Sequence, residues 1–164
     1  MRPTPAAGSF TLVELIIVVL IMGIIAATAL PAVSEAFVDA NLRSAARKLM
    51  ANLNYARNLA ITDGAAYGLT FSSSGYSVLK MINKADFASA DNIVATNPLT
   101  HSPWNVGLAG DHITLSANFS GQAGMYFDAT GAPNAAGQVS LSNGGLSFRV
   151  NVEAATGRVS VGPG

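Results

Sequence analysis

Side chains that could carry catalysis or bind a metal are scarce in this 164-residue chain. It has no cysteine, and its two histidines, His101 and His112, are eleven residues apart with neither a carboxylate nor a thiol at the spacing of a metal site. The serines Ser72–Ser74 precede a glycine, which is typical of a turn and not of a nucleophile elbow. Asp128 lies near Gly131, but no dense acidic cluster accompanies it as calcium would require. We therefore expect no enzyme, no metal site and no cofactor.

One carboxylate stands out because of its position. Glu14 lies at the mouth of an uncharged run of 20 residues, Leu15–Ser34, of which eleven are Leu, Ile or Val. A helix of this length reaches about 30 Å, the thickness of a bilayer core. Thr11 precedes Glu14 by three residues, as in a capping box, and a carboxylate in the first turn suits the helix dipole. The run therefore predicts a membrane-inserted helix.

Two ordinary interpretations of this N-terminus compete with a specialised one. A secretory signal peptide has a shorter apolar stretch, of roughly 7–15 residues, followed by a small-residue cleavage site. The present run is longer, although Ala26–Ala29 could mimic such a site. A plain single-span anchor fits the length, but it does not explain Glu14 at the mouth of the run with only Met1–Val13 before it.

The stretch Gly8–Leu15, followed by the apolar run and Pro31, resembles the class III signal and helix start of type IV pilins and type II secretion pseudopilins. In that family a prepilin peptidase cuts before the apolar run, and the new N-terminal residue, usually Phe, is N-methylated. A Glu is fifth in the mature chain and a Pro is commonly twenty-second. Counted from Phe10, Glu14 is fifth and Pro31 is twenty-second.

The cut site departs from the family pattern at one residue. The family has Gly directly before the cut and Phe directly after it, whereas Ser9 lies between Gly8 and Phe10. A cut after Gly8, which we favour, makes Glu14 the sixth residue, while a cut after Ser9 keeps it fifth but places Ser where Gly is expected. Both cuts stay open, and with them the identity of the methylated residue.

The resemblance also implies partners and a location. Glu14 would pair with the freed α-amine of a neighbouring subunit and so set the axial register, much as a buried polar residue does in a coiled coil. Pro31 would let the helix kink or locally unwind when the subunit leaves the bilayer for the filament. The implied partners are the prepilin peptidase, other pilins or pseudopilins and an inner-membrane assembly platform. The chain would be single-pass, with an extracytoplasmic globular domain.

After residue 34 the pattern becomes amphipathic. Small and aliphatic residues recur at steps of three and four while cations occupy other faces, which predicts a helix over 35–63 that packs on a sheet and stops at Asp63-Gly64. The apolar positions are Leu42, Ala45, Ala46, Leu49, Leu53, Ala56 and Ala60. The stretch with Tyr55-Ala56-Arg57 resembles the GspH/FimT branch of the family. We expect Tyr55 and Arg57 to pack or to face solvent.

The remaining residues, 64–164, switch to short alternating runs that predict strands. We place them at Tyr67–Phe71, Tyr76–Met81, Ile113–Phe119, Gly124–Phe127, Gln138–Leu141, Leu146–Val152 and Arg158–Val161, with a long loop at Asn83–Asp111. Phe127-Asp128-x-x-Gly131 and Thr156-Gly157-Arg158 also resemble the GspH/FimT branch. The predicted fold is α+β and pilin-like: leader 1–8, membrane and assembly helix 9–34, amphipathic half 35–63, and β-rich domain 64–164.

Two functions follow from the resemblance. One is a minor pseudopilin of a type II secretion system, and the other is a minor type IV pilin of the FimT kind, in pilus assembly or DNA uptake. DNA-binding members carry Gly-Arg-x-Arg near the C-terminus, and here only Arg158 of that pair is present. Beyond the helix the only cations are Lys80, Lys84, Arg149 and Arg158. Phosphate contacts dominate nucleic-acid affinity, so we expect secretion and no nucleic-acid partner, with Arg158 the one candidate contact. A bare membrane-tethered domain is the third alternative.

Overall fold

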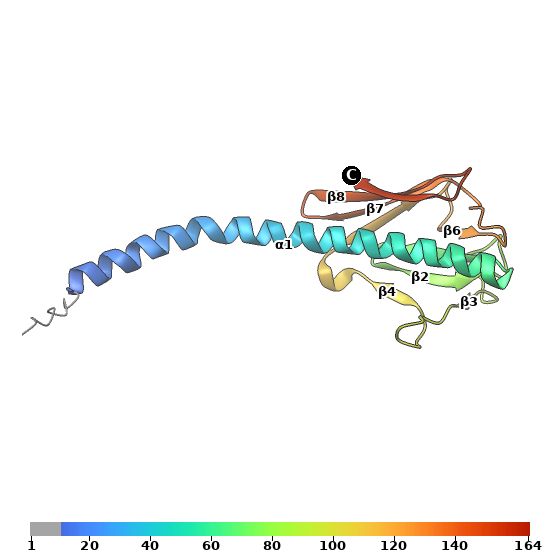
Figure 1. Ribbon diagram of the computed structural model, residues 1–164, viewed down its shortest axis with the longest axis horizontal. Coiled ribbons are helices and arrows are strands. Elements are labelled where there is room, and N and C mark those ends of the chain that lie inside the picture. Colours follow the sequence, from blue (N-terminus) through green and yellow to red (C-terminus); the bar gives the residue numbers. More distant parts are fainter. Residues whose placement is uncertain (1–10) are drawn as a thin grey trace, which may run out of the picture. The chain divides into compact units, whose positions relative to one another are not determined.

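The computed structural model describes residues 11–164, apart from the side chains of residues 28–35. Its elements are labelled in Figure 1. The chain divides into two compact units, one ending at Phe37 and the other spanning Val38–Gly164. The predicted cleavage residues Gly8, Ser9 and Phe10 lie outside the described residues.

A single helix, α1, runs from Leu12 to Asp63 and passes through both units. It begins where the capping pattern predicts, because the Glu14 amide donates to Thr11 Oγ1 at 3.2 Å and satisfies one of the free N–H groups of the first turn. It ends at the predicted stop, Asp63-Gly64. Gly64 has a φ of +61°, a left-handed conformation that commonly ends helices and that glycine adopts without strain. The backbone is helical through Pro31, whose side chain is not described.

The described part of the first unit is the beginning of α1, and the described side chains there are exposed on every side of the helix. All residues from 11 to 27 are exposed, and the large apolar ones between Leu12 and Ile25 keep 46–75% of their surface accessible. Within the part of the chain whose side chains are described, no helix combines the length and apolar character needed to span a bilayer. The run Leu15–Ser34 continues into residues whose side chains lie outside that part.

The second unit contains two antiparallel sheets. The first has five strands in the order β3-β2-β1-β6, with β4 also paired to β2, and the second has the order β5-β7-β8-β9. The strands are β1 (Tyr67–Ser72), β2 (Gly75–Lys80), β3 (Ile93–Val94), β4 (Asn105–Gly107), β5 (Thr114–Asn118), β6 (Gly124–Phe127), β7 (Gly137–Asn143), β8 (Leu146–Val152) and β9 (Val159–Pro163). A short 3-10 helix, η1, covers Ala109–Asp111.

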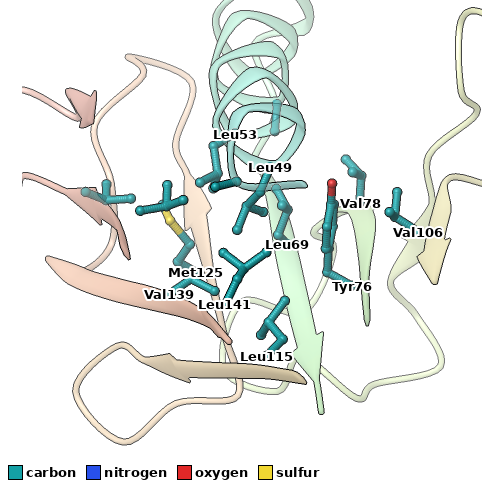
Figure 2. Close-up of a cluster of buried hydrophobic side chains, with 14 of the residues drawn as sticks. Leu49, Leu53, Leu69, Tyr76, Val78, Val106, Leu115, Met125, Val139 and Leu141 are labelled. Atoms are coloured by element: carbon teal, nitrogen blue, oxygen red, sulfur yellow. The ribbon is translucent and has the colours of Figure 1, made fainter. Parts of the chain in front are cut away.

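The core of this unit lies between the second half of α1 and both sheets. Six helix residues at steps of three and four have no exposed surface: Leu42, Ala46, Leu49, Leu53, Ala56 and Ala60. Figure 2 shows Leu49 and Leu53 pointing from α1 toward side chains of both sheets, among them Leu69 of the first sheet and Val139 of the second. The predicted amphipathic face is therefore the face that packs.

The fold class is confirmed, and two features differ from the prediction. Residues 83–111 were expected to be a loop, but β3 and β4 lie within them because the edge of β2 offers backbone partners at Leu79 and Tyr76. The strands also divide between two sheets where one was expected, since β5 pairs along its whole length with β7. Both differences concern pairing between distant segments, which local alternation does not encode.

Candidate functional site

The start of α1 presents a carboxylate in an apolar setting. Glu14 is exposed in the first turn, with Leu12, Val13 and Leu15 exposed beside it. Among the described side chains no cation forms an ion pair with Glu14, and the one ion pair is Arg43–Asp39 at 3.1 Å. A helix that is apolar all round buries its surface against lipid or other helices. The described residues therefore form an apolar helix with an exposed carboxylate in its first turn.

A second cluster joins the C-terminal part of α1 to the two sheets. Arg57 is half-buried, and its Nε donates a hydrogen bond of 3.0 Å to the carbonyl oxygen of Gly131, 74 residues further along the chain. Of the two expectations for Arg57, packing and exposure to solvent, the structure therefore shows packing. A guanidinium is suited to this position because its planar donors are directional.

The loop that accepts this hydrogen bond is held by its own first residue. Asp128 Oδ1 accepts from the Thr130 amide (2.8 Å), the Thr130 hydroxyl (2.6 Å) and the Ala132 amide (3.1 Å). Together with the nearby charge of Lys84, these hydrogen bonds, the Thr130 hydroxyl first, lower the pKa of the Asp128 carboxyl. Gly131 closes the turn by donating its amide to the Asp128 carbonyl at 2.8 Å.

Two glycines make room for Arg57 at this cluster. Gly131 has a φ of +79°, and a Cβ there would lie 2.7 Å from Ile61 Cδ1 and 3.2 Å from Arg57 Nε. Gly157, in the turn between β8 and β9, has a φ of +62°, and its Cβ would lie 3.0 Å from the Gly131 carbonyl oxygen. The three family-like motifs, separated in sequence, thus meet at one junction, and that junction is structural.

Tyr55, the other residue of the helix motif, packs on a residue that sequence analysis missed. Its ring lies 5.1 Å from the ring of Trp104, at an interplanar angle of 58°. Trp104 is buried and comes from the segment that was expected to be a loop. The sequence did contain one signal for this contact, a single tryptophan in a segment of weak periodicity. An aromatic side chain of that size is rarely left unpacked, so a packed segment could have been predicted there.

Tyr55 also borders a hollow of about 330 Å³ beside α1. Its rim includes Tyr67, whose hydroxyl donates to Asp63 Oδ2 at 2.6 Å. Burial, followed by this hydrogen bond and the negative charge of Asp63, raises the pKa of Tyr67 to about 12. The hydroxyl thereby ties the last residue of α1 to the first residue of β1.

The four cations beyond the helix do not form a patch. Lys80 lies 5.8 Å from the Tyr67 ring centre and Lys84 lies 5.9 Å from that of Tyr126. Arg149 is exposed on β8 and Arg158 is exposed just before β9, both at the second sheet, whereas Lys80 ends β2 of the first sheet and Lys84 lies in the loop after it. Isolated cations of this kind give little electrostatic attraction for a phosphate backbone.

The histidines lie in exposed turns. His101 and His112 have left-handed backbone conformations, with φ of +54° and +55°. Among the described residues, no group of three or more His, Asp or Glu side chains is placed to hold a metal ion.

Comparison with known proteins gives a family and a fold. Residues 45–157 match the family model described as type II transport protein GspH. The minor pseudopilin EpsH of the Vibrio cholerae type 2 secretion system matches with a TM-score of 0.58 and 14% identity, covering 75% of this chain and 97% of that one. The type IV minor pilin FimU of Pseudomonas aeruginosa matches with a TM-score of 0.54 and 20% identity, covering 74% and 88%. A comparison with curated protein sequences found no significant match.

Proposed function

Because this chain belongs to the GspH family, we propose that it is a minor pseudopilin of a type II secretion system that assembles into the pseudopilus through its N-terminal helix. The observation that carries the proposal is the start of α1, where every described apolar side chain between Leu12 and Ile25 is exposed. Such a surface is stable in lipid or among other helices and is costly in water.

The proposed assembly has two stages, and the same helix serves in both. In the first, the helix holds the subunit in the inner membrane, with its globular unit on the extracytoplasmic side. In the second, neighbouring helices replace the lipid around it, and Pro31 lets the backbone adjust. The assembly platform of the inner membrane and the other pseudopilins are the proposed partners.

Processing creates the group that Glu14 requires. A prepilin peptidase would cut after Gly8 or after Ser9, leaving Ser9 or Phe10 as the methylated N-terminal residue. The new α-amine is a cation, and its pairing with Glu14 of a neighbour would offset the cost of burying both charges among helices. Mass spectrometry of the mature N-terminus distinguishes the two cuts, and an uncut chain would contradict the proposal.

The test of Glu14 is its replacement by alanine. We expect Glu14→Ala to reduce incorporation into isolated pseudopili at least tenfold, while the amount of processed, membrane-bound subunit stays unchanged, because only the inter-subunit pairing is lost. Thr11→Ala is the matched control, since it removes the helix cap without removing the charge. Equal loss in both variants, or full incorporation of Glu14→Ala, would contradict the proposed pairing.

A minor type IV pilin is the alternative function. The fold similarity to FimU supports it to the same degree as the similarity to EpsH supports the first. Deletion of the gene separates the two, because a pseudopilin is needed for protein secretion and a minor pilin for pilus formation. For DNA uptake, binding of the full chain to duplex DNA at low salt should be absent. Binding that Arg158→Ala weakens would favour the alternative.

A further inference from the structure

The outer face of the second sheet has a shallow hollow whose lining residues make no contribution to the proposed assembly through α1. The hollow has a volume of about 590 Å³, which is within the usual range of small-ligand sites. Three carboxamides line it, those of Asn118 on β5, Gln138 on β7 and Asn151 on β8, and Glu153 is the one charged residue in the lining. The other lining residues are Ser120, Ala136, Gly137 and Val152.

The three carboxamides form a continuous row because of strand register. Asn118 is directly opposite Gln138, and Gln138 is directly opposite Asn151. Directly opposed residues point to the same face of a sheet, about 5 Å apart. Their neighbours Ala117, Val139 and Val150 face the core side, so the amides face outward, and all three are exposed.

The side-chain donors and acceptors of this row are not used within the described part of the chain. Each carboxamide offers two donors and an acceptor, and within residues 11–164 none of the three side chains forms a hydrogen bond. The same face behaves differently at its other end, where Thr114 and Ser142 bond to each other through their hydroxyls at 2.8 Å. Glu153 accepts from the Thr156 hydroxyl at 3.0 Å through one oxygen, and its other oxygen remains available.

The chemistry of the lining selects a class of ligand. Side-chain amides that both donate and accept suit the hydroxyl groups of a sugar ring, and the exposed Ala136 offers apolar contact for C–H groups. No cation lines the hollow, and the nearby Arg149 is two residues along β8 from Asn151. Arg158, whose carbonyl accepts from the Glu153 amide at 3.0 Å, is likewise outside the lining, so Glu153 is the charge closest to a bound ligand and disfavours an anion there. We infer that this hollow binds a neutral oligosaccharide, held by the carboxamide row and by Glu153.

The experiment uses the full chain in a zwitterionic detergent, because sugar-headed detergents would compete. An array of cello-, chito- and malto-oligosaccharides, sialylated and uronic-acid glycans and unstructured peptides is probed first. Isothermal titration calorimetry then measures the best neutral glycan. We expect Gln138→Ala and Asn151→Ala each to weaken binding about fivefold, and the double variant to abolish it, as for loss of one or two hydrogen bonds.

Two comparisons make the result decisive. Ser140→Ala changes the same face of β7 two residues away, outside the hollow, and should keep binding within about twofold. All four variants are solvent-facing, so unchanged Trp104 fluorescence checks that they fold. Failure of every neutral glycan to bind, preference for acidic glycans or for peptides, or unchanged affinity in the double variant would each overturn the inference. Loss of pseudopilus assembly in Glu14→Ala bears on none of these outcomes.

Discussion

The two halves of α1 treat their apolar residues in opposite ways. Between Leu12 and Ile25 every described large apolar side chain is exposed, whereas Leu42, Leu49 and Leu53 have no exposed surface at all. The second half packs on sheets of its own chain, whereas the described large apolar side chains of the first half stay exposed. The same element therefore stabilises the globular unit with one half and is available for lipid or other subunits with the other.

The largest expected effect comes from shortening one large aliphatic side chain in each half. Leu49→Ala should lower the free energy of unfolding of the globular unit by about 2–5 kcal/mol, because it leaves a cavity in a closely packed core. Ile17→Ala should change it by less than about 0.5 kcal/mol, because Ile17 is 52% exposed. Denaturant titration followed by Trp104 fluorescence measures both, and equal effects would remove the distinction between the halves.

A smaller effect is expected where α1 is joined to the loop after β6. Gly131→Ala introduces a methyl group 2.7 Å from Ile61 Cδ1 at a φ of +79°, so both strain and overlap should destabilise, together by about 2–3 kcal/mol. Gly144→Ala is the matched control. Gly144 also has a positive φ, +57°, but a methyl group there would meet no atom within 4 Å, so the substitution costs roughly 1–2 kcal/mol of backbone strain alone. If thermal unfolding shows the same loss in both, the Arg57 junction contributes nothing to holding the helix.

The smallest expected effect is a pH dependence at the end of α1. The pKa of Tyr67 is raised to about 12, so folding favours its neutral phenol. That contribution is complete below the ordinary tyrosine pKa of about 10 and is lost as the pH rises toward 12. Tyr67→Phe should therefore be less stable than the parent at pH 8, by about 1 kcal/mol, because the bond to Asp63 is lost.

The difference between Tyr67→Phe and the parent should shrink between pH 10 and pH 12. Denaturant midpoints across this range measure the effect. Tyr126→Phe serves as the control, because it leaves the bond between Tyr67 and Asp63 in place. A gap between parent and Tyr67→Phe that stays constant with pH would mean that the Tyr67 hydroxyl does not tie the helix end to β1.

Much of the architecture followed from local sequence. Thr11 caps α1, Gly64 ends it, and the apolar residues at steps of three and four form its buried face. These features were predictable because each signal acts within one or two turns of helix. The turn that joins β1 to β2 was likewise predicted, from Ser72–Ser74 and the glycine after them. The cleavage residues and the pairing of Glu14 remain predictions.

Other features had no local signal. The segment Asn83–Asp111 reads as a loop, yet β3 and β4 form within it by pairing with β2. Arg57 reads as a solvated or packing residue, yet its partner is the Gly131 carbonyl. In the sequence the three carboxamides are ordinary polar residues of separate strands, and only the strand register places Asn118 beside Gln138. Each depends on which distant segment lies alongside.

The sequence by itself determined the long helix, its two characters and its resemblance to pilins, because periodicity and capping are properties of neighbouring residues. The tertiary structure alone decided the division into two sheets, the junction at Arg57 and the hollow beside Gln138. The physical reason is that strand pairing and backbone acceptors are generic, so any strand edge could satisfy another. Only the packing of the whole unit around α1 selects which ones meet.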